Sequence, residues 1–256
     1  MSETIVGIDL GTTNSEIAVV RDGRVEVIPV AGAVRILPSV VGIGDDGTLL
    51  VGEAARNQHA LHPQRSVRSI KRRMGEDARV TMAGKDYAPQ EISAMILARL
   101  KTLAQAHLGH AVDKAVITVP ACFSDAQRQA TREAGQIAGL EVVRIINEPT
   151  AAALAYESRH QGASKALVYD LGGGTFDVSV VNLEGDVVEV LASHGNNHLG
   201  GDDFDRKLID HALAHLQQEH GIDAGGSPAV MARLQRAAEA AKIQLSDRPL
   251  DRKSVV

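Results

Sequence analysis

Two glycine-rich turns of nearly the same composition are the residues in this chain best suited to chemistry. The first turn is Asp9-Leu10-Gly11-Thr12-Thr13, and the second is Asp170-Leu171-Gly172-Gly173-Gly174-Thr175. Glycine lets backbone N–H groups approach an anion without a Cβ in the way, threonine adds a hydroxyl donor, and aspartate can hold a hydrated magnesium ion. Two such turns that face each other would clamp the phosphates of a nucleotide.

Each turn lies between two apolar runs rich in β-branched residues, which predicts a β-hairpin with a glycine-rich tip. The runs cover residues 5–8 and 17–20 around the first turn, and 166–169 and 176–181 around the second. The alternative is a pair of ordinary tight turns, since these residue types are common there. The same order of Asp, Leu, Gly and Thr in both copies favours phosphate binding. Neither copy is a Walker loop or opens a helix as a dinucleotide-binding fingerprint does.

Composition narrows the class of protein. The 256 residues, 44% of them hydrophobic, suffice for one large domain or two small ones. A net charge of −5, 2% aromatic residues and no tryptophan argue against a nucleic-acid partner. Because the sequence has one cysteine, no basic leader and no apolar stretch of membrane-spanning length, we expect no membrane association and a reducing, cytoplasmic location.

Predicted strands and helices alternate, which indicates an α/β fold. Residues 35–86 are polar and arginine-rich, and they indicate an inserted subdomain. Pro89 opens an amphipathic helix, and residues 115–119 and 142–146 are apolar runs typical of buried parallel strands. A capping box formed by Ser124 and Gln127 starts another helix, which Gly139 ends, and Thr150 is predicted to cap an alanine-rich helix over residues 151–156.

The pattern restarts at Ala166 with the second hairpin and a third strand over residues 187–191. A helix then follows Gly200-Gly201, and a second helix begins at Ser227-Pro228. If this half copies the first, a buried strand, a helix, another strand and a last helix are still to come. We therefore expect an incomplete second half with uncovered strand edges, and hence poor solubility or a mobile second half.

Four motifs together closely resemble the DnaK-type, seventy-kilodalton heat-shock chaperones. They are Gly7-Ile8-Asp9-Leu10-Gly11-Thr12-Thr13-Asn14-Ser15, Ile146-Asn147-Glu148-Pro149-Thr150-Ala151-Ala152-Ala153, the second glycine turn through Asp177, and His198-Leu199-Gly200-Gly201. The resemblance extends to about Ser246. It implies the ATP-binding and ATP-hydrolysing part of a molecular chaperone that assists protein folding. It also implies the actin-like ATPase fold, in which two lobes with ribonuclease-H-like cores hold ATP or ADP and magnesium between them.

The resemblance also implies domain boundaries and partners. Residues 1–160 would form lobe I, with an inserted subdomain at about 38–88. Residues 161–256 would form a truncated lobe II, whose second subdomain begins at about residue 200. A J-domain co-chaperone and a nucleotide exchange factor are the expected partners, and unfolded client peptides would bind only through a domain that is absent here.

Site residues follow from the same resemblance. Lys71 would reach the γ-phosphate and the attacking water, although by itself it is one more cation in a basic stretch. Thr175 and Asp177 are candidates for assisting that water, and Asp9, Glu148 and Asp170 would be both catalytic and the holders of magnesium through its water molecules. The phosphate-binding and nucleotide-binding set would be Gly11, Thr12, Thr13, Asn14, Gly172, Gly173, Gly174, Thr175, Gly200 and Gly201, with Glu239, Lys242 and Ser246 on the adenosine.

Other matches concern communication between domains. Pro120, with Arg128 or Arg132, would relay the nucleotide state to the peptide-binding domain of the family. Leu37, Cys122 and Asp202 stand where the family usually has threonine, tyrosine and glutamate. The second adenosine-binding glycine loop has no counterpart here, and residues 248–256 no longer follow the family.

Two alternative functions stay open. One is a truncated nucleotide-binding or co-chaperone-binding module without turnover. The other is a sugar kinase of the same fold superfamily, which would need a catalytic aspartate in a sugar pocket and would not carry these phosphate-loop motifs.

Overall fold

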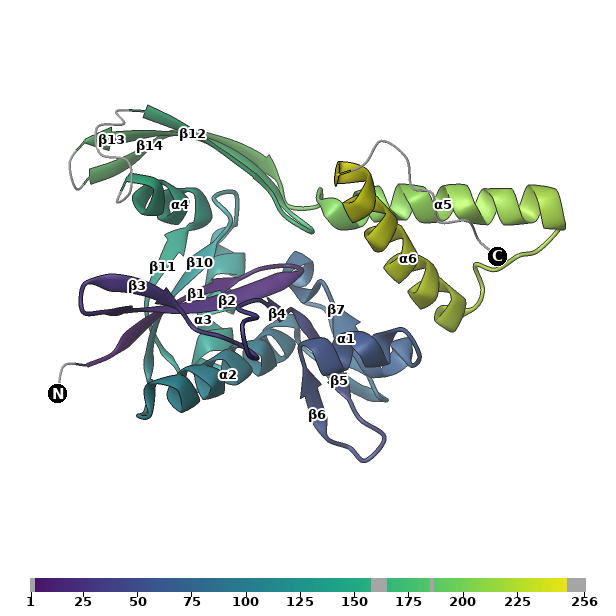
Figure 1. Cartoon of the computed structure of the whole chain (residues 1–256), viewed down its shortest axis with the longest axis horizontal. Coiled ribbons are helices and arrows are strands. Elements are labelled where there is room, and N and C mark those ends of the chain that lie inside the picture. Colours follow the sequence, from purple (N-terminus) through teal and green to yellow (C-terminus); the bar gives the residue numbers. More distant parts are fainter. Residues whose placement is uncertain (1–2, 158–164, 185–186, 248–256) are drawn as a thin grey trace.

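The computed structural model describes residues 3–157, 165–184 and 187–247, and its largest sheet carries the first glycine turn (Figure 1). The strand order in this sheet is β11-β10-β1-β2-β3, and β4 pairs with β2. β1 is parallel to β10, and β10 is parallel to β11, whereas β1, β2 and β3 are antiparallel neighbours. The strands are β1 (Ile5–Leu10), β2 (Asn14–Arg21), β3 (Arg24–Val27), β4 (Leu37–Pro38), β10 (Lys114–Val119) and β11 (Glu141–Asn147).

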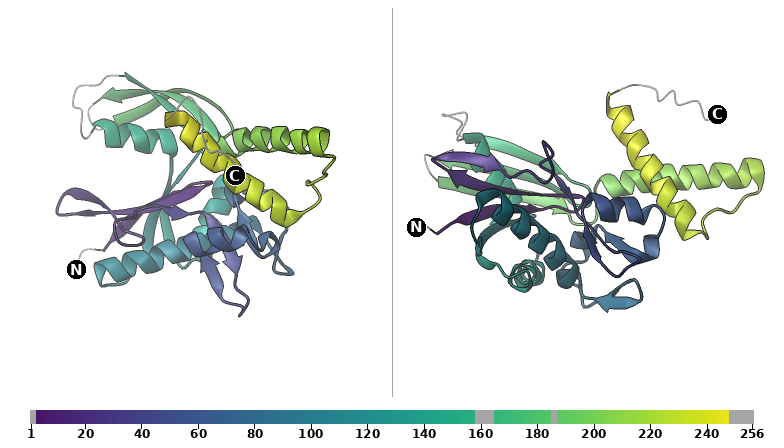
Figure 2. Two further views of the ribbon diagram at one scale, coloured as in Figure 1. Left: turned by 45° about the vertical axis from the view of Figure 1, so that its right-hand side comes forward. Right: turned by 60° about the horizontal axis from the view of Figure 1, so that its bottom comes forward.

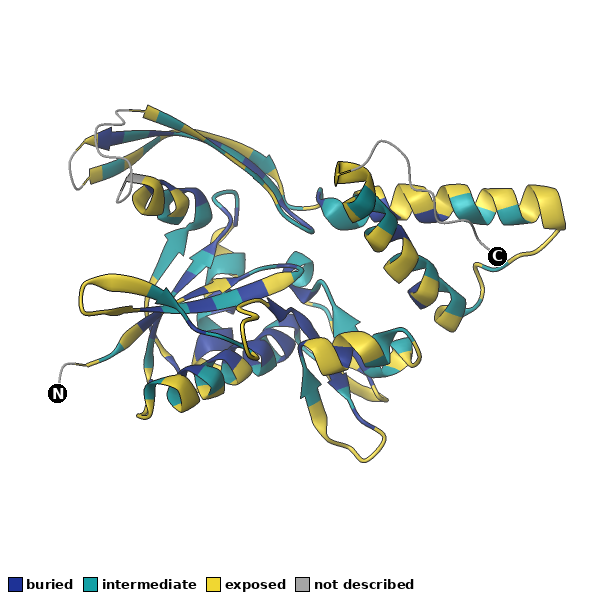
Figure 3. Cartoon of the chain, in the orientation of Figure 1, coloured by how far each residue is buried: buried dark blue, intermediate teal, exposed yellow. Residues whose placement is uncertain are grey.

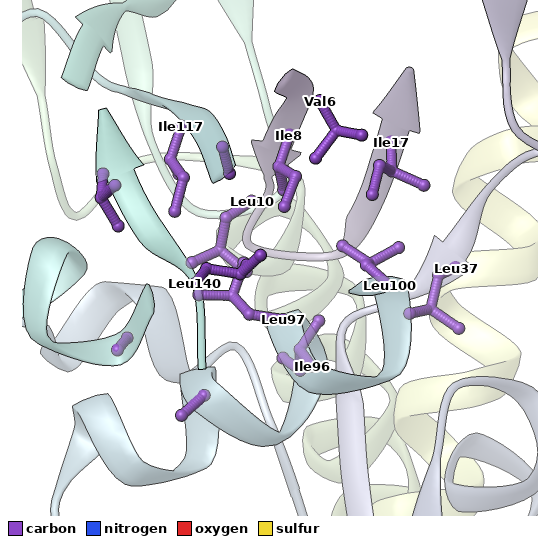
Figure 4. Packing of buried hydrophobic residues seen from close by; sticks show 14 of the residues in the cluster. Val6, Ile8, Leu10, Ile17, Leu37, Ile96, Leu97, Leu100, Ile117 and Leu140 are labelled. Carbon is purple, nitrogen blue, oxygen red and sulfur yellow. The ribbon is translucent and has the colours of Figure 1, made fainter. Parts of the chain in front are cut away.

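The hydrophobic core lies between this sheet and two helices, α2 (Pro89–Leu108) and α3 (Asp125–Ile137). Alternate residues of β1 and β2 point to one face, as the period of two in a strand requires. One face of α2 packs against them, because its apolar residues recur every three or four positions. Figure 4 shows this packing, to which Ile8, Ile17, Leu97, Leu100 and Ile117 contribute fully buried side chains.

Between β4 and α2 the chain forms two small sheets and several short helices. β5 lies between β6 and β7 in one sheet, and β8 pairs with β9 in the other. Helix α1 packs on the first of these sheets. The elements are β5 (Val40–Ile43), β6 (Leu49–Val51), α1 (Glu53–His59), η1 (Pro63–Arg65), β7 (Ser66–Arg68), η2 (Ile70–Arg73), β8 (Val80–Met82) and β9 (Lys85–Tyr87).

A separate antiparallel sheet carries the second glycine turn. It consists of β12 (Lys165–Leu171), β13 (Phe176–Glu184) and β14 (Val187–Asn196), in that order. Helix α4 (Glu148–Glu157) contacts all three strands, and a small core of Ala153, Val181 and Leu183 lies between them. The alternate residues of β12 are exposed, with Leu167 at 66% and Tyr169 at 64% (Figure 3). This sheet therefore has far less buried apolar contact than the large sheet.

Two long helices follow, α5 (Gly201–His220) and α6 (Pro228–Asp247). They pack on each other (Figure 2), and α6 also contacts η1. Helix α6 thus lies against the part of the chain between β4 and α2 that forms the small sheets. No helix in the three described ranges is long and apolar enough to cross a membrane.

Several predictions about single elements are confirmed. Pro89 opens α2, β10 and β11 are parallel, and Ser124 and Gln127 form the predicted capping box of α3. Gly139, just beyond α3, has the positive φ of 75° that favours glycine.

Other predicted boundaries are wrong. Thr150 lies inside α4, not at its N-cap, because the helix begins at Glu148 directly after β11 and Pro149 is accommodated in its first turn. β14 continues beyond residue 191 to Asn196, since its pairing with β13 runs to Phe176. The predicted departure from the family pattern at residues 248–256 falls outside the described residues.

The difference between the two cores leads to a stability prediction. Leu97→Ala removes a fully buried side chain and should lower the free energy of unfolding by about 2–5 kcal/mol. Leu167→Ala, on the exposed face of β12, should change it by less than about 0.5 kcal/mol. Urea unfolding monitored by circular dichroism measures both. Equal effects of the two substitutions would contradict this placement of the core.

Candidate functional site

The two glycine turns, far apart in the sequence, lie against each other. A Cβ on Gly173 would lie 1.7 Å from Oγ1 of Thr13, and a Cβ on Gly174 would lie 2.6 Å from Cγ2 of Thr12. Any side chain at these two positions would therefore collide with the opposite turn. The structure brings together the tips of two hairpins, β1–β2 and β12–β13, with only backbone on one side of the contact.

Each turn is also tight within itself. A Cβ on Gly11 would lie 2.0 Å from the carbonyl oxygen of Asn14, so the first turn closes only over glycine. In the second turn, the N–H of Gly172 donates to the carbonyl of Thr175 over 3.0 Å. Thr175 is buried, whereas Asn14 is exposed.

Three polar side-chain atoms around the tips are buried without a hydrogen-bond partner among the described residues. They are Oγ1 of Thr12, Oγ1 of Thr13 and Oδ1 of Asp177. A buried polar atom without a partner costs free energy, so such atoms are uncommon in a folded protein and need a reason. Two orphaned hydroxyls at the contact between the tips fit a ligand that accepts hydrogen bonds.

Lys71 lies beside this contact, on η2. It is buried, with 5% of its surface exposed, and its Nζ donates to Oε1 of Glu148 over 2.7 Å. Burial raises the pKa of Glu148, and the nearby Asp9 and Asp170 raise it further, while Lys71 opposes them. Burial also raises the pKa of Asp170, again against Lys71 and with Asp9 and Asp177 adding to the rise.

These shifts show that four carboxyl groups and one ammonium share a single electrostatic neighbourhood. Asp170 and Asp177 are directly opposite across β12 and β13, and Asp9 accepts a hydrogen bond from the hydroxyl of Thr118 over 3.0 Å. The excess of negative charge raises the free energy of the ionised carboxylates, and a cation would relieve it. In the described parts of the chain, no three such side chains are close enough to bind a metal directly. A hydrated magnesium ion, which keeps several water ligands, needs a wider arrangement than direct coordination does.

The first turn of α5 is fixed to the second glycine turn. The N–H of Gly201 donates to the carbonyl of Gly172 over 2.9 Å, and the N–H of Asp202 donates to that of Gly173 over 2.8 Å. A Cβ on Gly200 would lie 2.4 Å from the backbone nitrogen of Gly174. Gly200 and Gly201 are therefore structural supports of the second tip in this conformation.

The three residues predicted to hold the adenosine lie at different places on α6. Glu239 lines a cavity of about 210 Å³ that also includes Thr12 and Thr13 of the first tip. Lys242 Nζ donates to the carbonyl of Gly201 over 3.0 Å and forms an ion pair of 2.8 Å with the buried Asp205. Ser246 is exposed and donates to the carbonyl of Lys242, so the structure brings Glu239 to the first tip but not Ser246.

Cys122 lies close to the site. Its thiol is half-buried, and burial raises its pKa, with the nearby Asp177 raising it further. Its carbonyl accepts a hydrogen bond from the side chain of Asn197 over 3.1 Å. Cys122 thus helps to join the segment after β10 to the sheet of the second glycine turn.

Sequence reasoning missed one group of contacts, in which two acidic residues of α5 bind the segment around Lys71. Asp202 pairs with Arg68 over 3.1 Å and accepts a hydrogen bond from Ser69, and Asp203 pairs with Arg72 over 2.7 Å. The available signals were two adjacent acidic residues at a helix N-terminus and the arginine-rich stretch before Pro89. Nothing in the sequence indicated that these two segments meet.

Comparison with known proteins identifies the family of the chain. The sequence model of the family described as "Hsp70 protein" matches residues 5–254, so the expected departure from the family over residues 248–256 is wrong as far as residue 254. The chain is 59% identical over 246 residues to the chaperone protein DnaK of Thermotoga neapolitana, covering 95% of this chain and 41% of that protein. It is 56% identical over 248 residues to the DnaK of Thermosipho africanus, covering 96% of this chain and 42% of that protein.

The chain thus spans about two fifths of the length of the curated relatives that it matches. Over that span the match is nearly continuous, and it includes both glycine turns and Lys71. The chain belongs to the Hsp70 family.

Proposed function

We propose that this chain is the first part of the ATPase domain of a molecular chaperone that assists protein folding, and that ATP and ADP bind between its two glycine turns. The observation that carries the proposal is the contact of the turns, which leaves the hydroxyls of Thr12 and Thr13 buried without a partner. A phosphate group accepts several hydrogen bonds and can use both hydroxyls together with the free backbone N–H groups of the tips. The names of the DnaK relatives support the chaperone role.

The finer fold is part of the proposal. The large sheet, with α2 and α3, would be the ribonuclease-H-like core of lobe I, and residues 1–160 would form that lobe. The sheet β12–β14 would begin lobe II, with its second subdomain from about residue 200, where α5 starts. The two small sheets between β4 and α2 support an inserted subdomain at about 38–88.

The residues present fit magnesium and a triphosphate. Asp9, Glu148 and Asp170 would hold the ion through its water molecules, and the ion would neutralise charge on the phosphates. Lys71 would donate to the γ-phosphate from its buried position beside Glu148. A buried ammonium is effective there, since it acts in a site from which bulk water is excluded.

Two further residues would act on the attacking water. Thr175 and Asp177 are both buried beside the second tip, and Oδ1 of Asp177 has no hydrogen-bond partner among the described residues. A free carboxylate oxygen can accept a hydrogen bond from a water molecule and orient it. Phosphoryl transfer needs little more than such positioning and charge neutralisation.

Nucleotide binding must separate the tips. The space between Gly173 and Thr13 does not admit even a methyl group, so phosphates can enter only if the two hairpins move apart. On the side of the purine, Glu239 is the candidate that shares a cavity with the first tip, and Lys242 would have to leave Asp205 to contribute.

A module that binds nucleotide or a co-chaperone without turnover is the second candidate. The engagement of Lys242 by Asp205 and the exposure of Ser246 favour it, because they leave fewer contacts for the adenosine.

In either case we propose a J-domain co-chaperone and a nucleotide exchange factor as partners, and a cytoplasmic location. Client peptides would bind to another domain, with Pro120 and either Arg128 or Arg132 as the proposed relay. Arg128 donates to two carbonyls beside Pro120, which supports a role in fixing that loop.

Binding and turnover can be measured separately on the chain. Calorimetric titration should show one molecule of ATP bound per chain in the presence of magnesium. Removal of magnesium with EDTA should weaken the affinity by about tenfold or more, because the carboxylate cluster then repels the phosphates. ATP binding without release of phosphate would favour the second candidate, and the absence of any binding would overturn both nucleotide proposals.

Lys71→Ala tests the catalytic assignment. Single-turnover hydrolysis should fall by about a hundredfold or more, since the lysine stabilises charge that develops in the transition state. The dissociation constant for ATP should change by less than about tenfold, because the glycine turns supply most of the binding. Lys85→Ala is the matched control, since that lysine is exposed on β9. Unchanged hydrolysis in Lys71→Ala would remove Lys71 from the mechanism.

Gly173→Ala tests the contact of the tips. The new methyl group would occupy the position now taken by Thr13 Oγ1, so it should obstruct the phosphate site and weaken ATP binding by about tenfold or more. Gly226→Ala is the control, because no atom lies within 4 Å of a Cβ there. Calorimetry gives both affinities. Equal ATP affinity in the two variants would show that phosphate does not bind at the second tip.

A further inference from the structure

The segment that carries Lys71 begins with an unusual backbone conformation. Ser69, immediately before η2, has φ 53° and ψ 30°, in the left-handed region. Residues other than glycine rarely adopt this conformation, since their Cβ crowds the backbone. The surrounding structure must therefore hold Ser69 in place.

The group that holds Ser69 is the carboxylate of Asp202, at the start of α5. One oxygen, Oδ2, accepts a hydrogen bond from the hydroxyl of Ser69, and the other, Oδ1, accepts from the guanidinium of Arg68 over 3.1 Å. Both partners of the ion pair are largely shielded from solvent, with 23% of the Arg68 side chain and 16% of the Asp202 side chain exposed. The two oxygens of this carboxylate thus accept hydrogen bonds from two successive residues, Arg68 and Ser69.

A second contact supports the same geometry. Oδ2 of Asp203 accepts from the guanidinium of Arg72 over 2.7 Å, and it also accepts from the backbone N–H of Gly200 over 2.8 Å. The segment from Arg68 to Arg72 is therefore bound to the first turn of α5 on both sides of Lys71.

The first turn of α5 is itself bound to the second glycine turn through its backbone. The N–H of Asp202 donates to the carbonyl of Gly173, as described above. The backbone of Asp202 thus contacts a candidate phosphate turn, while its side chain contacts the residue two positions before Lys71. A displacement of the second glycine turn would be transmitted to the lysine through one amino acid.

We propose that Asp202 is a positioning residue for Lys71. Asp202 fixes the segment that carries Lys71 to the second glycine turn, so that the lysine and this turn close on the γ-phosphate together. Only the catalytic consequence of this role rests on the proposed function. Asp202 touches no reacting atom and acts through Ser69 and Arg68. The effect of its loss should be local, because Ile70 and Met74, on either side of the turn, are buried in the main core.

Hydrogen exchange tests the positioning without any nucleotide. In Asp202→Ala, exchange of the backbone amides of Arg72 and Met74, whose hydrogen bonds close η2, should rise by about fivefold or more. Asp202→Glu, which keeps the charge, should restore much of the protection. Asp210→Ala is the matched control on the same helix, because that aspartate is exposed and pairs only loosely with Arg206, at 3.9 Å. Unchanged exchange in Asp202→Ala would overturn the inference.

Single-turnover hydrolysis and calorimetry then test the consequence. Asp202→Ala should slow hydrolysis by about tenfold or more while it leaves ATP affinity within about threefold, since the ground-state contacts of the phosphates remain. Adding Ser69→Gly should recover part of the rate, because glycine adopts the left-handed conformation without being held. Equal loss of affinity and rate, or no recovery with Ser69→Gly, would contradict positioning. If the unsubstituted chain binds no ATP, the proposed function fails, while the exchange result still decides whether Asp202 holds the turn.

Discussion

The close contact of two glycine tips is the constraint on which the rest of this structure depends. The side chain of Thr13 can lie this close to the backbone of Gly173 only because residue 173 carries no side chain. The large sheet supplies one tip, the three-stranded sheet supplies the other, and α5 supports the second tip from behind through two backbone hydrogen bonds. Both hairpins are therefore placed by their sheets, while the contact itself needs glycine on the side of the second tip.

Charge is the second constraint. Lys71 is buried and pairs with Glu148, and three further carboxyl groups lie in the same region, those of Asp9, Asp170 and Asp177. Such an arrangement costs free energy unless a cation or protons compensate it, as the raised pKa values of Glu148 and Asp170 indicate. The proposed site for magnesium and phosphate would lower this cost, since the ion would bring positive charge to the carboxyl groups together with the ligand.

The sequence predicted the local elements well, because their signals are local. Periodic apolar residues, Pro89 and the capping box at Ser124 indicated α2, α3 and the parallel strands, and the repeated turn indicated two hairpins. Boundaries that depend on tertiary pairing were wrong, as at Asn196, where the partner strand extends β14. The link between Asp202 and Ser69 was not predicted at all, since it joins residues 133 positions apart and has no periodic signature.

The candidate site residues also divide into those with a local signal in the sequence and those without one. Glycines and threonines of the turns could be identified from their spacing, whereas Lys71 is one cation among several in a basic stretch and was recognised only by its resemblance to a family. Its burial and its pairing with Glu148 are the physical features that distinguish it, and neither can be read from a sequence. The assignment of Glu239, Lys242 and Ser246 to the adenosine stays a prediction, because these three residues of α6 contact different neighbours in space.

The most direct test of this account is a crystal structure of the chain with magnesium and a non-hydrolysable ATP analogue. The account predicts that the phosphates lie between the turns at Thr12–Thr13 and Gly173–Gly174, with the tips moved apart and Lys71 directed at the γ-phosphate. An analogue bound away from both glycine turns, with the two tips still in contact, would contradict it.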